Sequence, residues 1–130
     1  IETANVHAII QIQKKQYLRR NKVYRHNQPM PDLKNKQVIL VDDGVATGSS
    51  IMAAILAINS LHPKEIILAV PFLPPEVLKN LTSRVKKIFY LYTPDPFQSV
   101  GSWYEDFPQT SDKEVVDLCA SAKSKHTERT

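Results

Sequence analysis

Three short stretches of the chain are almost wholly apolar. Val38–Val41 is a run of four apolar residues, and the segments "EIILAVPF" (65–72) and "KKIFYLYT" (86–93) contain similar runs. Short runs of this kind are typical of strands that are buried on both faces of a sheet. We therefore predict three strands, at 38–41, 65–72 and 86–93.

Other segments place their apolar residues three or four positions apart, which is the spacing of one face of a helix. Between the first helical segment and the first strand, residues 21–36 are rich in Asn, Pro and Lys, and this composition predicts an exposed loop or a short strand with a mobile connection. The predicted helices cover 3–20, 49–61, 74–81 and 112–123.

Residues that favour helix starts precede the last three of these segments. Thr47, Ser49 or Ser50 can cap the helix at 49–61. Two prolines and an early Glu open the helix at 74–81, which is typical of a helix N-terminus. Ser111 and Glu114 have the spacing of a capping box ahead of the last helix.

From residue 38 onward, predicted strands and helices alternate strictly. This order is typical of an α/β fold with a doubly wound parallel sheet and flanking helices. A length of 130 residues fits one domain that buries a single core, so residues 1–130 are predicted to form one domain.

Composition and charge narrow the function classes. The longest apolar runs are far too short to span a bilayer, so we expect no membrane function. The net charge is +4, and eight Lys and Arg precede Val38 against two acidic residues. Such a patch suits an anionic ligand or nucleic acid, or it is simply a solvated helix face.

The single Cys119 excludes an internal disulfide, and a reducing, cytoplasmic setting is expected.

The segment "VILVDDGVATGSS" (38–50) carries the clearest chemical signal. Ligands of parallel sheets lie at the carboxyl ends of the strands, where Asp42 and Asp43 fall. The turn Gly44–Gly48 can direct backbone N–H groups inward and leads into a helix N-terminus, which together favour a phosphate. Because carboxylates repel phosphate but accept hydrogen bonds from hydroxyls, the pattern indicates a sugar phosphate with its diol on the acids.

This segment resembles the phosphoribosyl-diphosphate motif of the type I phosphoribosyltransferases. Together with "AVPFLPPEVL" and "VGSWYEDFPQTSDKEV", it looks most like a group of poorly characterised predicted bacterial phosphoribosyltransferases. The resemblance implies that Asp42 and Asp43 are catalytic and hold the ribose 2′ and 3′ hydroxyls. The residues that it implies for the 5′-phosphate are Gly44, Val45, Ala46, Thr47, Gly48, Ser49 and Ser50.

The implied reaction is displacement of diphosphate from phosphoribosyl diphosphate by a nucleobase-like acceptor. Two nearby carboxylates can stabilise the positive charge that builds on the ribose. The expected cofactor is Mg²⁺, held mainly by the diphosphate and not directly by protein ligands. Ala46 stands where relatives that act on 6-oxopurines carry an acid, so the motif looks more like the adenine type. A nucleoside monophosphate is a second ligand that fits, and a homodimer is compatible with the resemblance.

Two parts of the site are assigned less directly. Complete members of the family grip the diphosphate with an upstream loop, which reads like Pro-Arg-Gly-Gly in the bacterial group, and residues 1–37 contain no match. We therefore expect the chain to be the C-terminal part of a longer domain and to have little transfer activity alone. Arg19, Arg20 and Arg25 are candidates to bind diphosphate from a mobile connection.

The aromatic residues near the C-terminus allow two interpretations. Trp103, Tyr104 and Phe107 have the bulk of core or hood packing, which we favour. Alternatively, Phe97, Trp103 or Tyr104 stacks on a flat acceptor.

Four other functions remain as alternatives. They are a non-catalytic phosphoribosyl- or nucleotide-binding regulatory module (or an inactive fragment), a nucleic-acid binder, a receiver domain with Asp95 as phosphoacceptor, and a purely structural turn at the acid pair. No nucleic-acid motif supports the second, and prolines on both sides of Asp95 disfavour the third. The four histidines show no pair at metal-ligand spacing.

Overall fold

The computed structural model describes the backbone of residues 3–127 and the side chains of residues 7–122. The chain divides into two compact units. One, which we call the sheet unit, comprises Pro31–Phe107, and the other, the helical unit, is drawn from the residues up to Met30 and from Pro108 onward.

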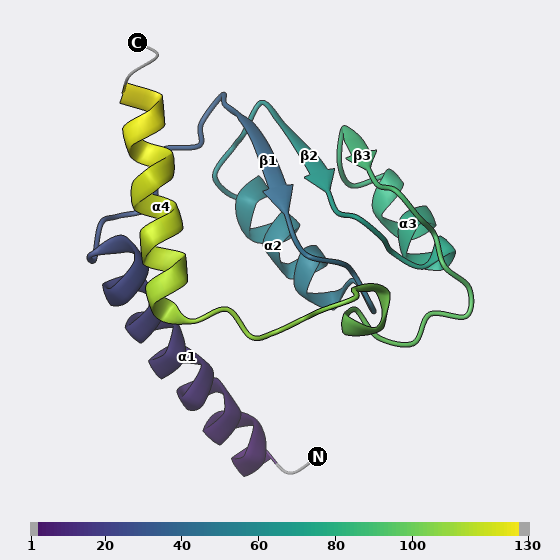
Figure 1. The fold of residues 1–130 in the computed structure, drawn as a ribbon, viewed down its shortest axis with the longest axis horizontal. Helices are drawn as coiled ribbons and strands as arrows, with labels where there is room; N and C mark the ends of the chain where they lie inside the picture. The colour runs from purple at the N-terminus through teal and green to yellow at the C-terminus, as the bar shows by residue number, and fades with distance from the viewer. Residues whose placement is uncertain (1–2, 128–130) are drawn as a thin grey trace. The chain divides into compact units, whose positions relative to one another are not determined.

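The sheet unit contains a three-stranded parallel sheet in the order β1-β2-β3 (Figure 1). The strands are β1 (Gln37–Val41), β2 (Glu65–Ala69) and β3 (Lys87–Phe89). The connecting helices are α2 (Ser49–Asn59) and α3 (Pro75–Thr82), and a short 3₁₀ helix, η1, covers Gly101–Trp103. The predicted fold class, a parallel α/β sheet with flanking helices, is confirmed.

Both connecting helices of the sheet unit pack on the same face of the sheet. Ile55 of α2, Leu68 of β2 and Leu81 of α3 are fully buried in one hydrophobic cluster. Each right-handed crossover adds the next strand on the same side of the previous one, and this places successive helices on one face. Side chains of β1 that point to the opposite face are open to solvent, as Val41 with an exposed fraction of 69% shows.

The helical unit contains α1 (Thr3–Arg25) and α4 (Asp112–Thr127), which contact one another. Arg19 Nη1 lies 2.5 Å from Asp112 Oδ2, and the Tyr24 hydroxyl also donates to Asp112. These two hydrogen bonds hold the pKa of the Asp112 carboxyl below its usual value, and the bond to Asp112 raises the pKa of Tyr24.

The predicted capping box at the start of α4 is confirmed. Ser111 N–H donates to Glu114 Oε2 at 2.7 Å, and Glu114 N–H donates to Ser111 Oγ at 3.3 Å. The same bonds lower the pKa of Glu114, because they stabilise its ionised form. The sequence pattern alone therefore predicted where α4 begins.

The first helix extends further than predicted. Residues 21–25 belong to α1 and not to a loop or strand, so Arg19, Arg20 and Arg25 lie on a helix and not on a mobile connection. No Gly or Pro interrupts this segment, and Lys22 and Arg25 place positive charge in the last turn, where the helix dipole favours it. The helix ends where His26 and Asn27 adopt positive φ angles of 51° and 57°.

The second and third strands are shorter than predicted. β2 ends at Ala69 and β3 at Phe89, although an isolated parallel bridge joins Phe72 to Tyr92 beyond both strand ends. Pro71 lies between β2 and this bridge and has no N–H to continue the ladder. Within the described residues, no helix is both long enough and apolar enough to cross a membrane.

Candidate functional site

The acid loop, residues 42–48, connects the carboxyl end of β1 to α2. Asp42 N–H donates to the Ala69 carbonyl oxygen at 3.4 Å, and Val45 N–H donates to the Phe72 carbonyl oxygen at 3.0 Å. The Val45 side chain is buried, with an exposed fraction of 3%. The loop is therefore fastened at its first residue and at its middle to the end of β2 and the chain that follows it.

Two glycines are required by the shape of the acid loop. A Cβ at Gly44 would overlap the ring of Phe72, so only glycine permits this close approach. Gly48 has a φ of 77°, and a Cβ there would lie 2.9 Å from Val77 Cγ1. A side chain at either position would displace the loop from its support.

The helix that follows the loop begins without a side-chain cap. Gly48 occupies the N-cap position and no side chain caps α2, so the prediction that Thr47, Ser49 or Ser50 caps this helix is wrong. The left-handed backbone of Gly48 explains this, because the N-cap residue there has no side chain. Thr47 Oγ1 instead bonds to Ser49 Oγ at 3.1 Å and accepts the Ser49 N–H at 3.4 Å.

This helix start leaves backbone donors for an anion. Met52 N–H donates to the Gly48 carbonyl oxygen at 2.8 Å, and the N–H groups of residues 50 and 51 precede this bond, whereas the Ser49 N–H already donates to Thr47 Oγ1 at 3.4 Å. The first N–H groups of any helix have no acceptor within the helix and lie at its positive end. A phosphate at this position would accept hydrogen bonds from them.

The two predicted catalytic acids lie side by side at the start of the loop, and both are exposed. Asp42 Oδ1 accepts the N–H of Asp43 at 3.0 Å, which orients the Asp42 carboxylate along the loop. Because both residues directly follow β1, they lie at the sheet edge that binds ligands in parallel α/β folds.

Two of the cavities that border the acid loop share lining residues with one another. The smaller, of about 210 Å³, is lined mostly by loop residues, including Asp42, Gly44 and Thr47, together with Val100. The larger, of about 520 Å³, shares Ala46 and Thr47 with it. A ligand that fills both would extend from the loop into the larger cavity.

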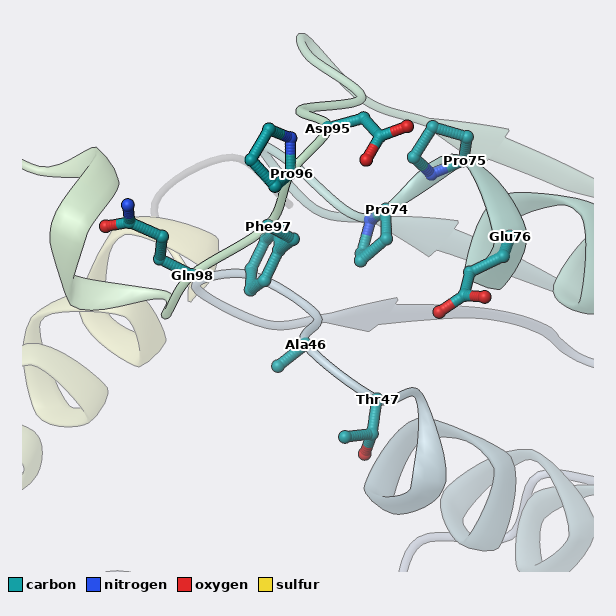
Figure 2. A pocket seen from close by; sticks show the side chains of 9 residues that line it. All are labelled: Ala46, Thr47, Pro74, Pro75, Glu76, Asp95, Pro96, Phe97 and Gln98. Atoms are coloured by element: carbon teal, nitrogen blue, oxygen red, sulfur yellow. The ribbon is translucent and has the colours of Figure 1, made fainter.

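The larger cavity has an aromatic wall and acidic borders. Figure 2 shows the Phe97 ring beside Pro74 and above Ala46, with the carboxylates of Glu76 and Asp95 at the border. Its lining contains no Lys, Arg or His. Glu76 could not be singled out as a site residue from the sequence, because an acid in the first turn of a helix is also what the helix dipole favours.

The aromatic acceptor-stacking candidates differ in whether they line the larger cavity. Phe97 lines the larger cavity. All three rings lie near Phe72, with centroids 6.4 Å (Phe97), 6.2 Å (Trp103) and 5.5 Å (Tyr104) away. Trp103 and Tyr104 do not line the larger cavity, which agrees with the packing interpretation for these two. Phe72 was not singled out from the sequence, because an apolar residue in an apolar run carries no local signal of its contacts.

The three candidate diphosphate ligands all lie on α1 in the helical unit. Arg19 is paired with Asp112, and Arg25 Nη2 donates to the Pro29 carbonyl oxygen at 2.7 Å. Within the described residues, no group of three His, Cys, Asp or Glu side chains is arranged to hold a metal ion.

Comparison with known proteins identifies the family. The family model described as a phosphoribosyl transferase domain matches residues 4–105. The chain belongs to the phosphoribosyl transferase domain family. The resemblance that the motif at 38–50 carried is thereby confirmed.

Two Mycobacterium tuberculosis proteins, named "Putative phosphoribosyl transferase" MT0597 (strain CDC 1551 / Oshkosh) and Rv0571c (strain ATCC 25618 / H37Rv), are similar to this phosphoribosyl transferase domain. Each is 31% identical to it over 116 residues, which is 89% of this chain and 26% of the relative. The chain thus spans about a quarter of the length of these curated relatives.

A solved structure is similar over most of the domain. The crystal structure of TT1426 from Thermus thermophilus aligns with a TM-score of 0.76 and 30% sequence identity. The alignment covers 93% of this chain and 58% of that chain.

Proposed function

We propose that this phosphoribosyl transferase domain binds phosphoribosyl diphosphate at the acid loop. In this proposal the domain transfers the phosphoribosyl group to a nucleobase-like acceptor. One observation carries the proposal: two exposed carboxylates at the end of β1 are followed, within one short loop, by a helix start without a side-chain cap. The first feature suits a diol and the second suits a phosphate, and a ribose 5-phosphate contains both.

The ribose contacts are assigned to the acids. Asp42 and Asp43 accept hydrogen bonds from the 2′ and 3′ hydroxyls, and charge-assisted bonds of this kind are stronger than neutral ones. The 5′-phosphate lies against the N–H groups of residues 50 and 51, with hydroxyls of Thr47, Ser49 and Ser50 as further donors. The small cavity of about 210 Å³, whose lining includes Asp42, Thr47 and Ser50, is the space for this part of the ligand.

The larger cavity is assigned to the acceptor. The Phe97 ring offers a face on which a planar heterocycle stacks. Glu76 and Asp95 accept hydrogen bonds from N–H groups and repel anions, and no basic residue in the lining offsets them. The cavity therefore favours a neutral or cationic acceptor with N–H donors over an acidic one. Ala46, at its edge, has no proton to exchange with the acceptor.

The chemistry follows from this arrangement. The bond between the anomeric carbon and the diphosphate oxygen breaks, and its electron pair leaves with diphosphate. A lone pair on an acceptor nitrogen forms the new carbon–nitrogen bond, and that nitrogen releases its proton to water. Positive charge that develops on the ribose is stabilised by Asp42 and Asp43.

Mg²⁺ is the expected cofactor, and the oxygen atoms that the acid loop offers are of the kind that bind it. The acid loop offers two exposed carboxylates, and Mg²⁺ typically combines one or two carboxylates with substrate phosphates. When bound, Mg²⁺ neutralises charge on the leaving diphosphate. Asp42 and Asp43 are the residues of this chain that would approach it.

A second function, binding without transfer, is favoured by one observation. The two cavities assigned to the ligand have no Lys or Arg in their linings, so neither supplies a cationic grip for the diphosphate. A phosphoribosyl- or nucleotide-binding regulatory module would need only the loop. Diphosphate release in the presence of Mg²⁺ and a panel of bases distinguishes the two functions.

Calorimetry tests the binding proposal. Ribose 5-phosphate is expected to bind more tightly than inorganic phosphate, and ribose more weakly than either, because only the first engages both halves of the loop. Circular dichroism establishes that the chain is folded. Absence of binding of ribose 5-phosphate to the folded chain would refute the proposal. Tighter binding of inorganic phosphate than of ribose 5-phosphate would show that Asp42 and Asp43 do not bind the ribose hydroxyls.

A further inference from the structure

Tyr104 connects the segment after η1 to the acid loop, which lies 61 residues earlier in the sequence. Its hydroxyl donates a hydrogen bond of 2.6 Å to the main-chain carbonyl oxygen of Asp43. The N–H of Asp43 in turn donates to Asp42 Oδ1. The Tyr104 hydroxyl therefore contacts the loop at the peptide that directly follows the second acid.

The Tyr104 ring is fixed independently of this hydrogen bond. It lies edge-on against Phe72, with centroids 5.5 Å apart, and stacks on Phe107, with centroids 4.9 Å apart. Gly101 permits this arrangement, since a Cβ there would lie 3.0 Å from Phe107 Cδ1. Packing on two sides thus sets where the hydroxyl points.

Phe72 holds the same part of the loop from the sheet. Its ring covers Gly44 so closely that no side chain fits there, and its carbonyl oxygen accepts the Val45 N–H at 3.0 Å. Tyr104 packs on Phe72 and bonds to Asp43, so contacts reach three consecutive loop residues, Asp43, Gly44 and Val45.

The bond to Asp43 fixes a peptide plane. The Asp43–Gly44 peptide is trans, because the cis peptide of the described chain is Asp95–Pro96. In a trans peptide the carbonyl and the following N–H point in opposite directions. Holding the Asp43 oxygen toward Tyr104 therefore directs the Gly44 N–H away from Tyr104 and prevents rotation of the plane between the acids and the rest of the loop.

We propose that Tyr104 is a positioning residue that orients the Asp42 and Asp43 carboxylates for the ribose hydroxyls. This inference rests on the proposed function of the acid loop. It assigns Tyr104 a different role from acceptor stacking, because its ring is used in packing and its hydroxyl in loop support.

The substitution Tyr104→Phe in the full chain separates this role from packing, since it keeps the ring and removes the hydroxyl. Loss of one hydrogen bond is expected to weaken ribose 5-phosphate binding by about tenfold. Inorganic phosphate affinity and the thermal midpoint are expected to stay close to wild type, because phosphate is held at the start of α2. Tyr90→Phe is the matched control, as the partly exposed Tyr90 has no hydrogen bond to the loop.

A double-mutant cycle with Asp42→Asn and Asp43→Asn gives the second readout. If Tyr104 acts through the acids, Tyr104→Phe has no further effect on ribose 5-phosphate affinity once both acids are removed. An equal loss in both backgrounds, or equal losses of ribose 5-phosphate and phosphate affinity, would overturn the inference and leave Tyr104 as packing only.

Hydrogen exchange of the free protein tests whether Tyr104 holds the acid loop, even if the proposed function is wrong. Failure of wild type to bind ribose 5-phosphate would refute the proposed function alone. In the free chain, Tyr104→Phe is expected to speed exchange at the Asp43 and Val45 amides by about tenfold. The Leu68 amide in β2 should not change. Unchanged exchange at Asp43 and Val45 would show that Tyr104 does not hold the loop.

Discussion

The sheet unit and the helical unit use their apolar residues in opposite ways. The sheet unit buries Ile55, Leu68, Leu73 and Leu81 completely, whereas no described side chain of the helical unit is buried. Leu18 on α1, for example, has an exposed fraction of 55%. In the helical unit, polar contacts from Arg19 and Tyr24 to Asp112 connect α1 to α4. The acid loop therefore belongs to the unit that has a packed hydrophobic core.

This difference matters for the site, because binding geometry needs a rigid support. Val45 is buried in the same cluster as the core residues of α2 and α3, and the loop backbone is bonded to the extension of β2. The candidate ligand groups are exposed, but the backbone that carries them is anchored. We expect substitutions in the two units to have correspondingly different consequences.

The largest expected effect is on stability, and it compares one leucine in each unit. Leu81→Ala removes a fully buried side chain and should lower the free energy of unfolding by about 3 kcal/mol. Leu18→Ala removes an exposed side chain and should change it by less than about 0.5 kcal/mol. Urea denaturation measures both. Equal losses would mean that the helical unit contributes as much to the core as the sheet unit does.

A second comparison neutralises acids in each unit. Asp42→Asn with Asp43→Asn should reduce ribose 5-phosphate affinity by about a hundredfold, because two charge-assisted hydrogen bonds are lost. Stability should not fall, since two neighbouring like charges are removed. Asp112→Asn is the control: it removes the partner of Arg19 and Tyr24. Calorimetry should show unchanged affinity for the control, and unchanged affinity for the double variant would place the diol elsewhere.

The smallest expected effect is a pH dependence within the helical unit. The folded pKa of Asp112 is lowered by its bonds to Arg19 and Tyr24, so the stabilisation is present above the unfolded pKa and is lost as pH falls through the folded pKa. The contact between α1 and α4 should therefore weaken in acid, below about pH 4. Nuclear magnetic resonance titration of Asp112 measures its midpoint.

Arg19→Gln should raise the Asp112 midpoint, because it removes the first of the groups that lower it. Lys15→Gln removes the same charge from α1 without removing a bond to Asp112 and should shift the midpoint less. An Asp112 midpoint that is equal in wild type and Arg19→Gln would contradict the assigned cause.

Local patterns in the sequence predicted the element order, the capping box at Ser111 and the place of the acid loop. Each depends on residues that are close in sequence. The end of α1 was missed because residues 21–25 contain no breaker, and the cap of α2 because a glycine, not a hydroxyl, takes that position. In both cases the local sequence allows more than one helix boundary, and contacts with the rest of the fold decide which one forms.

Contacts between distant residues could not be predicted in this way. The bond from Tyr104 to Asp43 spans 61 residues, and the same residue reads equally well as a stacking or a packing aromatic from the sequence. The cavity beside the loop likewise combines three segments, around Ala46, Glu76 and Phe97. Their meeting depends on the sheet order and on how the loops after β2 and β3 pack.

The central claim is that the acid loop and the start of α2 bind a ribose 5-phosphate, and an amide titration by nuclear magnetic resonance tests it most directly. Ribose 5-phosphate should shift the backbone amides of Gly44 and of Ser49–Ile51 saturably, and inorganic phosphate should shift the latter group alone, since it does not reach the acids. Saturable binding that leaves the amides of residues 49–51 unshifted would contradict the account.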